Sequence, residues 1–202
     1  MPGGRPRAFD PEAALDAALE VFWRQGYEGT SVADLTAALG INRPSLYASF
    51  GNKEQLFNAA LDRYFASAGA YAAEALAAPT IREVVERLVL GAVELTCGEH
   101  TPRGCLCVNS AQACGPDSEP IRRQAVARRM AGEAALRRRF EQASDLPSGY
   151  DPGDFARLVH TVTDGIAVQA ASGHTRDQLE RVAALALRGL FQARRLTPGA
   201  AR

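Results

Sequence analysis

Residues 30–56 read TSVADLTAALGINRPSLYASFGNKEQL, and this stretch decides the fold. It opens with Ser31 and, three positions later, Asp34, which together form the pattern of a capping box at a helix start. Apolar residues then recur at helical spacing, namely Val32, Leu35 and Leu39. Gly40 follows the last of them, and a glycine can adopt the left-handed conformation that ends a helix and turns the chain. The stretch therefore predicts a short helix closed by a glycine turn.

A second short helix is predicted directly after this turn, with Asn42 as its N-cap. Leu46 and Phe50 lie four positions apart and face inward. The outer side then carries Arg43, Ser45, Tyr47 and Ser49. Two short helices joined by a glycine turn, with hydrogen-bond donors exposed on the second, are typical of a helix-turn-helix that enters the DNA major groove. An ordinary corner between two helices is the alternative that this pattern alone leaves open.

The next predicted helix begins at Asn52 and carries Lys53 in its first turn. Lys53 is the only lysine of the chain, which otherwise uses arginine for every positive side chain. A lysine at a helix start opposes the helix macrodipole unless an anion is nearby. A bound DNA phosphate would supply that anion, and this favours the DNA-binding interpretation over a solvated surface charge.

These residues resemble the DNA-binding domain of the TetR/AcrR family of bacterial transcriptional regulators. The resemblance covers about residues 8–60 and rests on Phe50 and four motifs: TSVADL at 30–35, GIN at 40–42, SLY at 45–47 and KEQL at 53–56. It implies a DNA-contacting set of Ser31, Arg43, Ser45, Tyr47 and Lys53. Within this set, Tyr47 and Lys53 would bind backbone phosphates. Ala48 and Ser49 stand where many members carry larger donors, so we expect few groups to reach base edges.

The resemblance also implies an all-α fold of two domains. Residues 1–51 would form an N-terminal arm and a three-helix helix-turn-helix domain, and residues 52–202 a larger helical domain for ligand binding and dimerisation. A connecting helix over about 52–76 would transmit the ligand state. A small-molecule effector would occupy a cavity near Phe65, Tyr71, Cys105 and His160. We therefore predict a repressor that a small molecule releases from its operator, with no cofactor, no metal and no catalytic residue.

The charge of the chain argues against DNA binding that ignores sequence. The 202 residues hold 23 basic and 23 acidic side chains, and residues 1–66 hold six basic against eight acidic ones, a net charge of minus two. A general nucleic-acid binder is expected to be basic. Phosphate contacts are local, however, so a few clustered donors suffice for a specific site. Since no apolar run is long enough for a membrane span and no signal peptide opens the chain, we expect a cytoplasmic protein with reduced cysteines.

The last two predicted helices carry the dimerisation signal. Small or apolar residues line the outer side of the helix over about 155–173: Thr161, Gly165 and Val168. The final helix is apolar on more than one face, with Val182, Leu185 and Leu190 expected at the interface. A helix that is apolar on two sides needs two partners, so we expect a twofold homodimer joined by a four-helix bundle. It would present two reading helices about 34–36 Å apart to a pseudo-palindromic operator in double-stranded DNA.

An arginine-rich helix is predicted over about 121–143. Its arginines can form a second basic surface for DNA, or they can be the solvated face of a helix that buries its other side. The clear apolar side of the pattern favours the solvated face.

Four cysteines lie close together in the sequence: Cys97, Cys105, Cys107 and Cys114. The most common role for such residues is to fill an apolar core. A thiol-based redox or electrophile sensor is the alternative, because Cys105 lies at a predicted helix start beside Arg103 and both features favour the thiolate. A zinc site is disfavoured since no C-x2-C pair is present. A thiol-dependent enzyme using Cys105 and His100 lacks a third catalytic group and an oxyanion motif.

Overall fold

The computed structural model describes residues 10–98, 101–112, 115 and 118–192 of the chain. All regular secondary structure in these ranges is helical, which confirms the all-α prediction. The helices are α1 (Pro11–Gly29), α2 (Val32–Leu39), α3 (Arg43–Phe50), α4 (Lys53–Ala66), α5 (Ala70–Leu76), α6 (Ile81–Cys97), α7 (Leu106–Ser110), α8 (Glu119–Glu141), α9 (Pro152–Ala171) and α10 (Arg176–Gln192). The predicted N-terminal arm, residues 1–9, lies outside the described residues. No helix in the described ranges is long and apolar enough to cross a bilayer.

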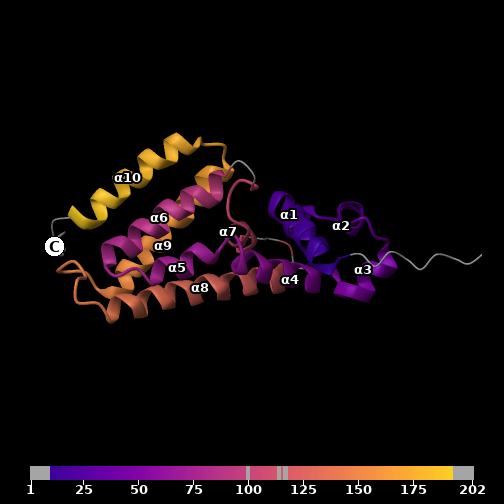
Figure 1. The fold of residues 1–202 in the computed structure, drawn as a ribbon, viewed down its shortest axis with the longest axis horizontal. Helices are drawn as coiled ribbons and strands as arrows, with labels where there is room; N and C mark the ends of the chain where they lie inside the picture. Colours follow the sequence, from indigo (N-terminus) through magenta and orange to yellow (C-terminus); the bar gives the residue numbers. More distant parts are fainter. Residues whose placement is uncertain (1–9, 99–100, 113–114, 116–117, 193–202) are drawn as a thin grey trace, which may run out of the picture.

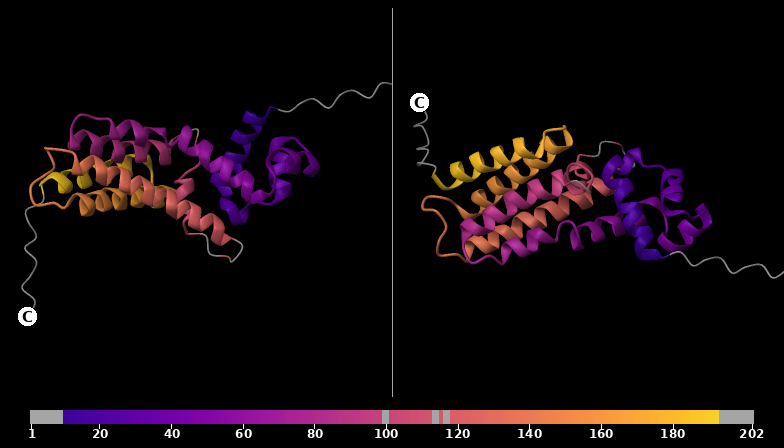
Figure 2. Two further views of the ribbon diagram at one scale, coloured as in Figure 1. Left: turned by 90° about the horizontal axis from the view of Figure 1, so that it is seen from below. Right: turned by 45° about the horizontal axis from the view of Figure 1, so that its top comes forward.

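The molecule is elongated, with α1, α2 and α3 at one end and α5, α6, α9 and α10 at the other (Figure 1). Helix α8 runs along one side and reaches from the far end of the molecule to α4 (Figure 1, Figure 2). The short helix α7 lies where the two ends meet, in contact with α1 and α9. The arrangement therefore matches an N-terminal helix-turn-helix domain followed by a larger helical domain.

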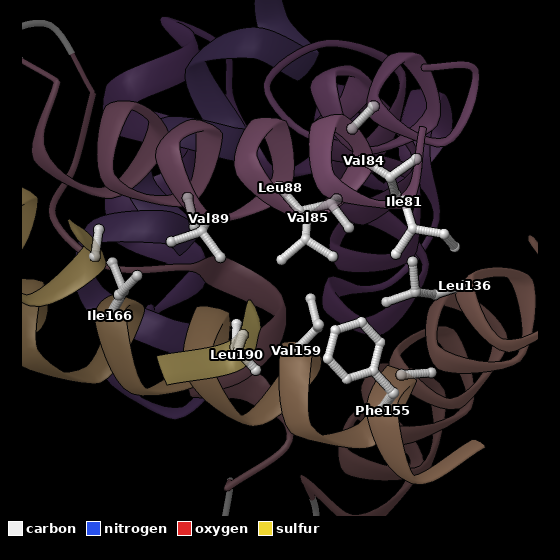
Figure 3. Close-up of a cluster of buried hydrophobic side chains, with 14 of the residues drawn as sticks. Ile81, Val84, Val85, Leu88, Val89, Leu136, Phe155, Val159, Ile166 and Leu190 are labelled. Atoms are coloured by element: carbon white, nitrogen blue, oxygen red, sulfur yellow. The ribbon is translucent and has the colours of Figure 1, made fainter. Parts of the chain in front are cut away.

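Two clusters of buried apolar side chains form the core of the molecule. In the larger domain, side chains from α6, α8, α9 and α10 converge, with Val85, Phe155, Val159 and Leu190 among those buried (Figure 3). In the other cluster, the inner face of α4 packs against α1, and Phe57 meets Phe22 edge to face with ring centroids 5.1 Å apart. This second cluster also contains buried residues of α7 and α8. The apolar core of the small domain thus continues past residue 51 and includes α4.

The predicted connecting helix over 52–76 is interrupted, so its continuity was wrong. Helix α4 ends at Ala66, and Ser67 has φ −116° and ψ −89°, which is not helical. The Ser67 hydroxyl donates to the Arg63 carbonyl at 2.7 Å, and the Gly69 N–H donates to the Tyr64 carbonyl at 2.8 Å. A side-chain competition of this kind loosens a helix at serine. The break lets the next helix, α5, turn toward α6, with which it makes many contacts.

The helix that was predicted to start at Cys105 is short. Helix α7 covers only Leu106–Ser110, with Cys105 as its N-cap and without a side-chain cap. Two turn residues follow it, and positions 113–114 lie outside the described residues. Because a helix of little more than one turn has few internal hydrogen bonds, α7 depends on burial among α1, α8 and α9.

Candidate functional site

The turn between α2 and α3 is fixed by the helix caps that the sequence predicts. The Ser31 hydroxyl oxygen accepts from the Asp34 N–H at 3.1 Å, and the Asp34 carboxylate accepts from the Ser31 N–H at 2.8 Å. Gly40 then adopts φ 65°, the left-handed conformation that glycine tolerates. The Asn42 side chain accepts from the Ser45 N–H at 2.9 Å and starts α3. These contacts confirm the predicted caps and set the angle between the two helices.

Helix α3 buries one side and presents the other to solvent. Leu46 is fully buried in the cluster with α1 and α4. Tyr47, the next residue, is 49% exposed, and Arg43 is also exposed. Neither side chain has an ion-pair or hydrogen-bond partner among the described residues. Their polar groups are therefore free to bind something outside the chain.

Lys53 begins α4 and is held beside the small domain. Its Nζ lies 4.2 Å from the centroid of the Tyr27 ring, a cation–π contact. Partial burial lowers the pKa of Lys53, although the carboxylates of Glu28 and Asp34 oppose this shift. Nζ has no direct ion pair among the described residues. Of the predicted residues, Tyr47 and Arg43 lie on the exposed face of α3, and Lys53 lies at the start of α4 on the Tyr27 ring. The hydroxyl of Ser31 donates to the Asp34 carboxylate in its own helix cap.

The acidic residues of the small domain are mostly engaged by groups of the same chain. Arg63 binds both Glu12 and Asp16, at 2.8 and 2.7 Å, and the hydrogen bond from Arg63 lowers the pKa of Asp16. Asp62 pairs with Arg128 of α8. The Glu28 carboxylate accepts from the Gly115 N–H at 2.6 Å. Most of the acidic side chains counted in the sequence are therefore engaged by groups of the chain itself.

A cavity of about 470 Å³ lies within the larger domain. Its wall is built from α4 to α9 and is mostly apolar. Phe65, Tyr71, Cys105 and His160, the four residues that the sequence assigned to a ligand pocket, all line it. The Tyr71 ring lies so close to α6 that a Cβ added at Gly91 would meet it at 2.3 Å. Gly91 is thus the residue that lets α5 close this side of the cavity.

The polar groups of the cavity wall are mainly paired with one another. Arg129 forms an ion pair with Asp164, and Arg128 forms one with Asp62, just outside the wall. The Tyr64 hydroxyl donates to the Cys105 sulfur at 3.1 Å. Burial lowers the pKa of His160, so its imidazole is favoured in the uncharged form. The wall therefore combines apolar surface with a few polar groups whose charges are balanced.

The structure favours the core-packing prediction for Cys105 over the alternative of an activated thiol. Burial raises the pKa of Cys105, and it raises that of Cys107 to about 12. Arg103, which was expected to favour the thiolate, donates instead to the His174 carbonyl at 3.1 Å. His100 and Cys114 lie outside the described residues. Within the described ranges no group of three or more His, Cys, Asp or Glu side chains could hold a metal ion.

The two domains meet at a contact that the sequence alone did not reveal. The indole N–H of Trp23, on α1, donates to the Gly104 carbonyl at 2.9 Å in a buried position. Gly104 has φ 85°, and a Cβ there would meet the Ala171 side chain of α9 at 3.0 Å. The ring of Tyr64 packs edge to face on Trp23, with centroids 4.9 Å apart. Because Tyr64 also lines the cavity, one residue that contacts α1 is part of the cavity wall, and Cys105, which follows Gly104, is another part of that wall.

The residues predicted for dimerisation are divided between the surface and the core. Thr161, Gly165, Val168 and the α10 residues Val182 and Leu185 are exposed, and Leu185 is 61% accessible. Leu190 is buried in the core of its own chain. Leu158 of α9 is exposed as well, so both α9 and α10 present apolar side chains to solvent. Exposed apolar surface of this kind is a candidate protein–protein interface.

The sequence is similar to known regulators over nearly its full length. Residues 14–60 match the family model of bacterial regulatory proteins, tetR family. The HTH-type transcriptional repressor ComR of Escherichia coli (strain K12) is 32% identical over 190 residues, which cover 92% of this chain and 90% of ComR. The HTH-type transcriptional repressor BdcR of the same strain is 31% identical, covering 91% of this chain and 90% of BdcR.

Solved structures show the same similarity. A cysteine mutant of the TetR family transcriptional regulator CifR, in complex with 26-base-pair double-strand operator DNA, is 41% identical. It superposes with a TM-score of 0.86 over 92% of this chain and 98% of the CifR chain. Both domains, and not only the helix-turn-helix, therefore have counterparts in that structure.

Proposed function

Since the chain belongs to the TetR family and is a DNA-binding transcriptional regulator, we propose that it is a repressor whose operator affinity falls when a small molecule occupies the cavity. The observation that carries this proposal is that Tyr64 lines the cavity, packs on Trp23 of α1 and donates its hydroxyl hydrogen bond to Cys105. A ligand that displaces Tyr64 acts directly on the contact with α1.

Operator binding rests on a small number of donors on and beside α3. Arg43 and Ser45 contact bases or phosphates of the major groove in this proposal, and Tyr47 and Lys53 bind backbone phosphates. Support comes from the exposure of Tyr47 and Arg43 next to the buried Leu46, which fixes the helix that carries them. Ser31 contributes chiefly as the cap of α2, because its hydroxyl already binds Asp34.

Ligand binding alters the angle of the small domain through the segment that follows α6. Gly104 is wedged between Trp23 and α9, and Cys105 is the next residue. A molecule entering the cavity pushes on Cys105 or Tyr64, and this strains the hydrogen bond from Trp23 to Gly104. The effect on DNA equals the difference in ligand affinity between the two conformations.

A homodimer is part of the proposal because one α3 reads only a half-site. The exposed residues Val168, Val182 and Leu185 supply an apolar surface on α9 and α10, and Thr161 and Gly165 let a second copy approach closely. Leu190 supports this interface from beneath, since it packs α10 onto the core.

A thiol-based sensor is the second candidate, and one observation favours it: Cys105 and Cys107 both line the cavity. In this form an electrophile would reach a thiol only from inside the cavity. Because burial raises both pKa values, reaction at neutral pH is expected to be slow. Titration of the native protein with a thiol reagent tests this, and rapid modification of Cys105 that releases the operator would favour the sensor.

Selection of binding sites from random double-stranded DNA tests the main proposal. We expect a pseudo-palindrome whose half-sites lie about one helical turn, or a small multiple of one, apart. Recovery of unrelated sequences without twofold symmetry would contradict an operator-specific dimer. Trp23 is the only tryptophan, so its emission reports on the contact with Gly104 when a candidate ligand is added, and a ligand that releases DNA without changing this emission would contradict the proposed route.

A further inference from the structure

The chemical class of the ligand follows from the charge of the cavity wall, and this inference rests on the proposed function of the cavity as the effector site. Arg128 and Arg129 are its cationic residues, and each is paired with a carboxylate. Asp164, the wall's only carboxylate among the described residues, is the partner of Arg129. Every formal charge on the wall thus has its counter-ion inside the protein.

A net charge on the ligand would meet no free counter-ion in this cavity. Moving an ion from water into apolar surroundings is costly unless it is paired and hydrogen-bonded. An anionic ligand would have to compete with Asp164 for Arg129, and a cationic one would have to compete with Arg129 for Asp164. Rings and aliphatic side chains make up most of the remaining wall, among them Phe65, Leu88 and Leu136. An uncharged ligand avoids this competition.

One hydroxyl of the wall nevertheless has no acceptor. The hydroxyl of Tyr71 has no hydrogen-bond partner in the described part of the chain. The Nε–H of Arg129 also lacks a partner there, but this nitrogen has almost no accessible surface, so a ligand in the cavity does not reach it. Burial raises the pKa of Tyr71, with the charges of Cys105 and Asp164 adding to the shift, so its hydroxyl keeps its proton. A buried donor without an acceptor is costly, and a ligand that supplies one gains the difference.

The other hydroxyls of the wall offer less. Thr96 donates to the Ala92 carbonyl at 2.7 Å, and Thr163 donates to the His160 carbonyl at 3.0 Å. Tyr64 donates to Cys105. His160 carries one donor and one acceptor in its uncharged form. Tyr71 is therefore the donor of the wall for which a ligand can supply the missing acceptor.

We propose that the cavity binds an uncharged, mainly apolar molecule carrying an acceptor oxygen, such as a ketone or an ester, and that the Tyr71 hydroxyl donates to this oxygen. The volume of about 470 Å³ admits a molecule of one or two rings with a short chain. Specificity comes from the oxygen, because the apolar wall by itself discriminates weakly between hydrocarbons of similar size.

Four probes with one shared skeleton test this class: acetylnaphthalene, ethylnaphthalene, naphthoate and naphthylmethylammonium. Their affinities for the full chain are measured by isothermal titration calorimetry. We expect the ketone to bind about tenfold more tightly than the hydrocarbon, the difference that one completed hydrogen bond supplies. The two ions are expected to bind more weakly than the hydrocarbon. Tightest binding by naphthoate, or equal binding of ketone and hydrocarbon, would overturn the proposal, as would no binding of any probe.

A variant assigns the donor. Tyr71→Phe preserves the ring and should remove most of the ketone's advantage, while the affinity for ethylnaphthalene stays unchanged. Tyr150→Phe is the matched control, because Tyr150 does not line the cavity. An unchanged advantage of the ketone in Tyr71→Phe would overturn the assignment.

Operator binding in the presence of acetylnaphthalene is measured separately by fluorescence anisotropy. Binding of the ketone without a change in operator affinity would contradict the proposed release mechanism while supporting the ligand class. Release by naphthoate alone would contradict the ligand class while supporting the release mechanism. The two proposals therefore fail in different measurements.

Discussion

Helices α3 and α8 differ in the use of their positive charges. Helix α3 contains one arginine, Arg43, which is exposed and has no partner among the described residues. Helix α8 contains seven, and most of them are already bound within the chain: Arg122 and Arg123 to Glu119, Arg128 to Asp62, Arg129 to Asp164, Arg137 to Glu141 and Arg139 to backbone carbonyls. The structure therefore favours the solvated and paired interpretation of α8 over a second DNA surface.

This difference shows that the availability of donors locates a DNA-binding surface better than their number. An arginine that already binds a carboxylate releases less favourable energy on meeting a phosphate, because it must first give up its partner. A tyrosine or lysine without such a partner has no such cost. The net charge of the small domain, minus two over residues 1–66, is compatible with operator binding for this reason.

The largest expected effect is a loss of operator affinity when the free donors on and beside α3 are removed. The double variant Tyr47→Phe, Lys53→Ala should lower operator affinity about a hundredfold. It should also reduce the slope of log affinity against log salt by about one, because Lys53 is the one cation removed and it neutralises one phosphate. Fluorescence anisotropy at several salt concentrations measures both. Arg138→Ala on α8 is the control, since Arg138 is exposed and outside both sites. Equal losses in the control and the double variant would refute the distinction between the helices.

A smaller effect tests the structural role of α8. Arg139 donates to the carbonyls of Leu76, Ala78 and Pro79, at 3.2, 2.9 and 3.2 Å, and so closes the end of α5. Arg139→Met leaves these acceptors without their donor and should lower the free energy of unfolding by about 1–3 kcal/mol. Urea denaturation followed by circular dichroism measures this. Operator affinity of the folded variant should stay unchanged, and a selective loss of DNA binding at normal stability would place Arg139 at the DNA instead.

The smallest effect concerns the cap that orients α3. Ser31→Ala should lower the free energy of unfolding by about 1 kcal/mol, since it removes the N-cap acceptor of α2. Ser49→Ala, at an exposed position of α3, is the control. A loss larger for Ser49→Ala than for Ser31→Ala would be inconsistent with the cap.

The same variant has a pH signature. The hydrogen bonds from Ser31 lower the pKa of Asp34 from its ordinary value of 3.8. A carboxyl with a lowered folded-state pKa stabilises the protein fully above its unfolded value, and this contribution is lost as the pH falls through the folded-state pKa. The wild type should therefore lose stability below pH 3.8 more steeply than Ser31→Ala, as measured by urea denaturation across that range. Parallel curves would show that Ser31 does not set this pKa.

Several features were predictable from local sequence because neighbours along the chain decide them. The caps at Ser31 and Asn42 each follow from one polar side chain and its position before an apolar helical pattern. The turn at Gly40 follows from its freedom to take a positive φ. The family resemblance also predicted four residues of a pocket, and all four line one cavity. This prediction succeeds because the chain shares its fold with family members such as CifR.

Other features were not predictable because residues distant in sequence decide them. The break at Ser67 places α5 against α6, and no local signal separates it from a continuous amphipathic helix. Trp23 reads as an ordinary core residue until its N–H is found on Gly104, 81 residues away. The sequence shows Cys105 at a predicted helix start beside Arg103, which would favour the thiolate, and only the structure shows that burial raises its pKa.

The sequence by itself determined the helical fold, the capped α2–turn–α3 unit and the identity of the exposed donors on α3, since these depend on hydrogen bonds and periodicities that span only a few residues. Only the tertiary structure decided which charged side chains remain unpaired, which thiols are buried and that the Tyr71 hydroxyl in the cavity wall lacks an acceptor. Those properties depend on desolvation and on ion pairs between helices, and both are set by the packing of segments that lie far apart in the chain.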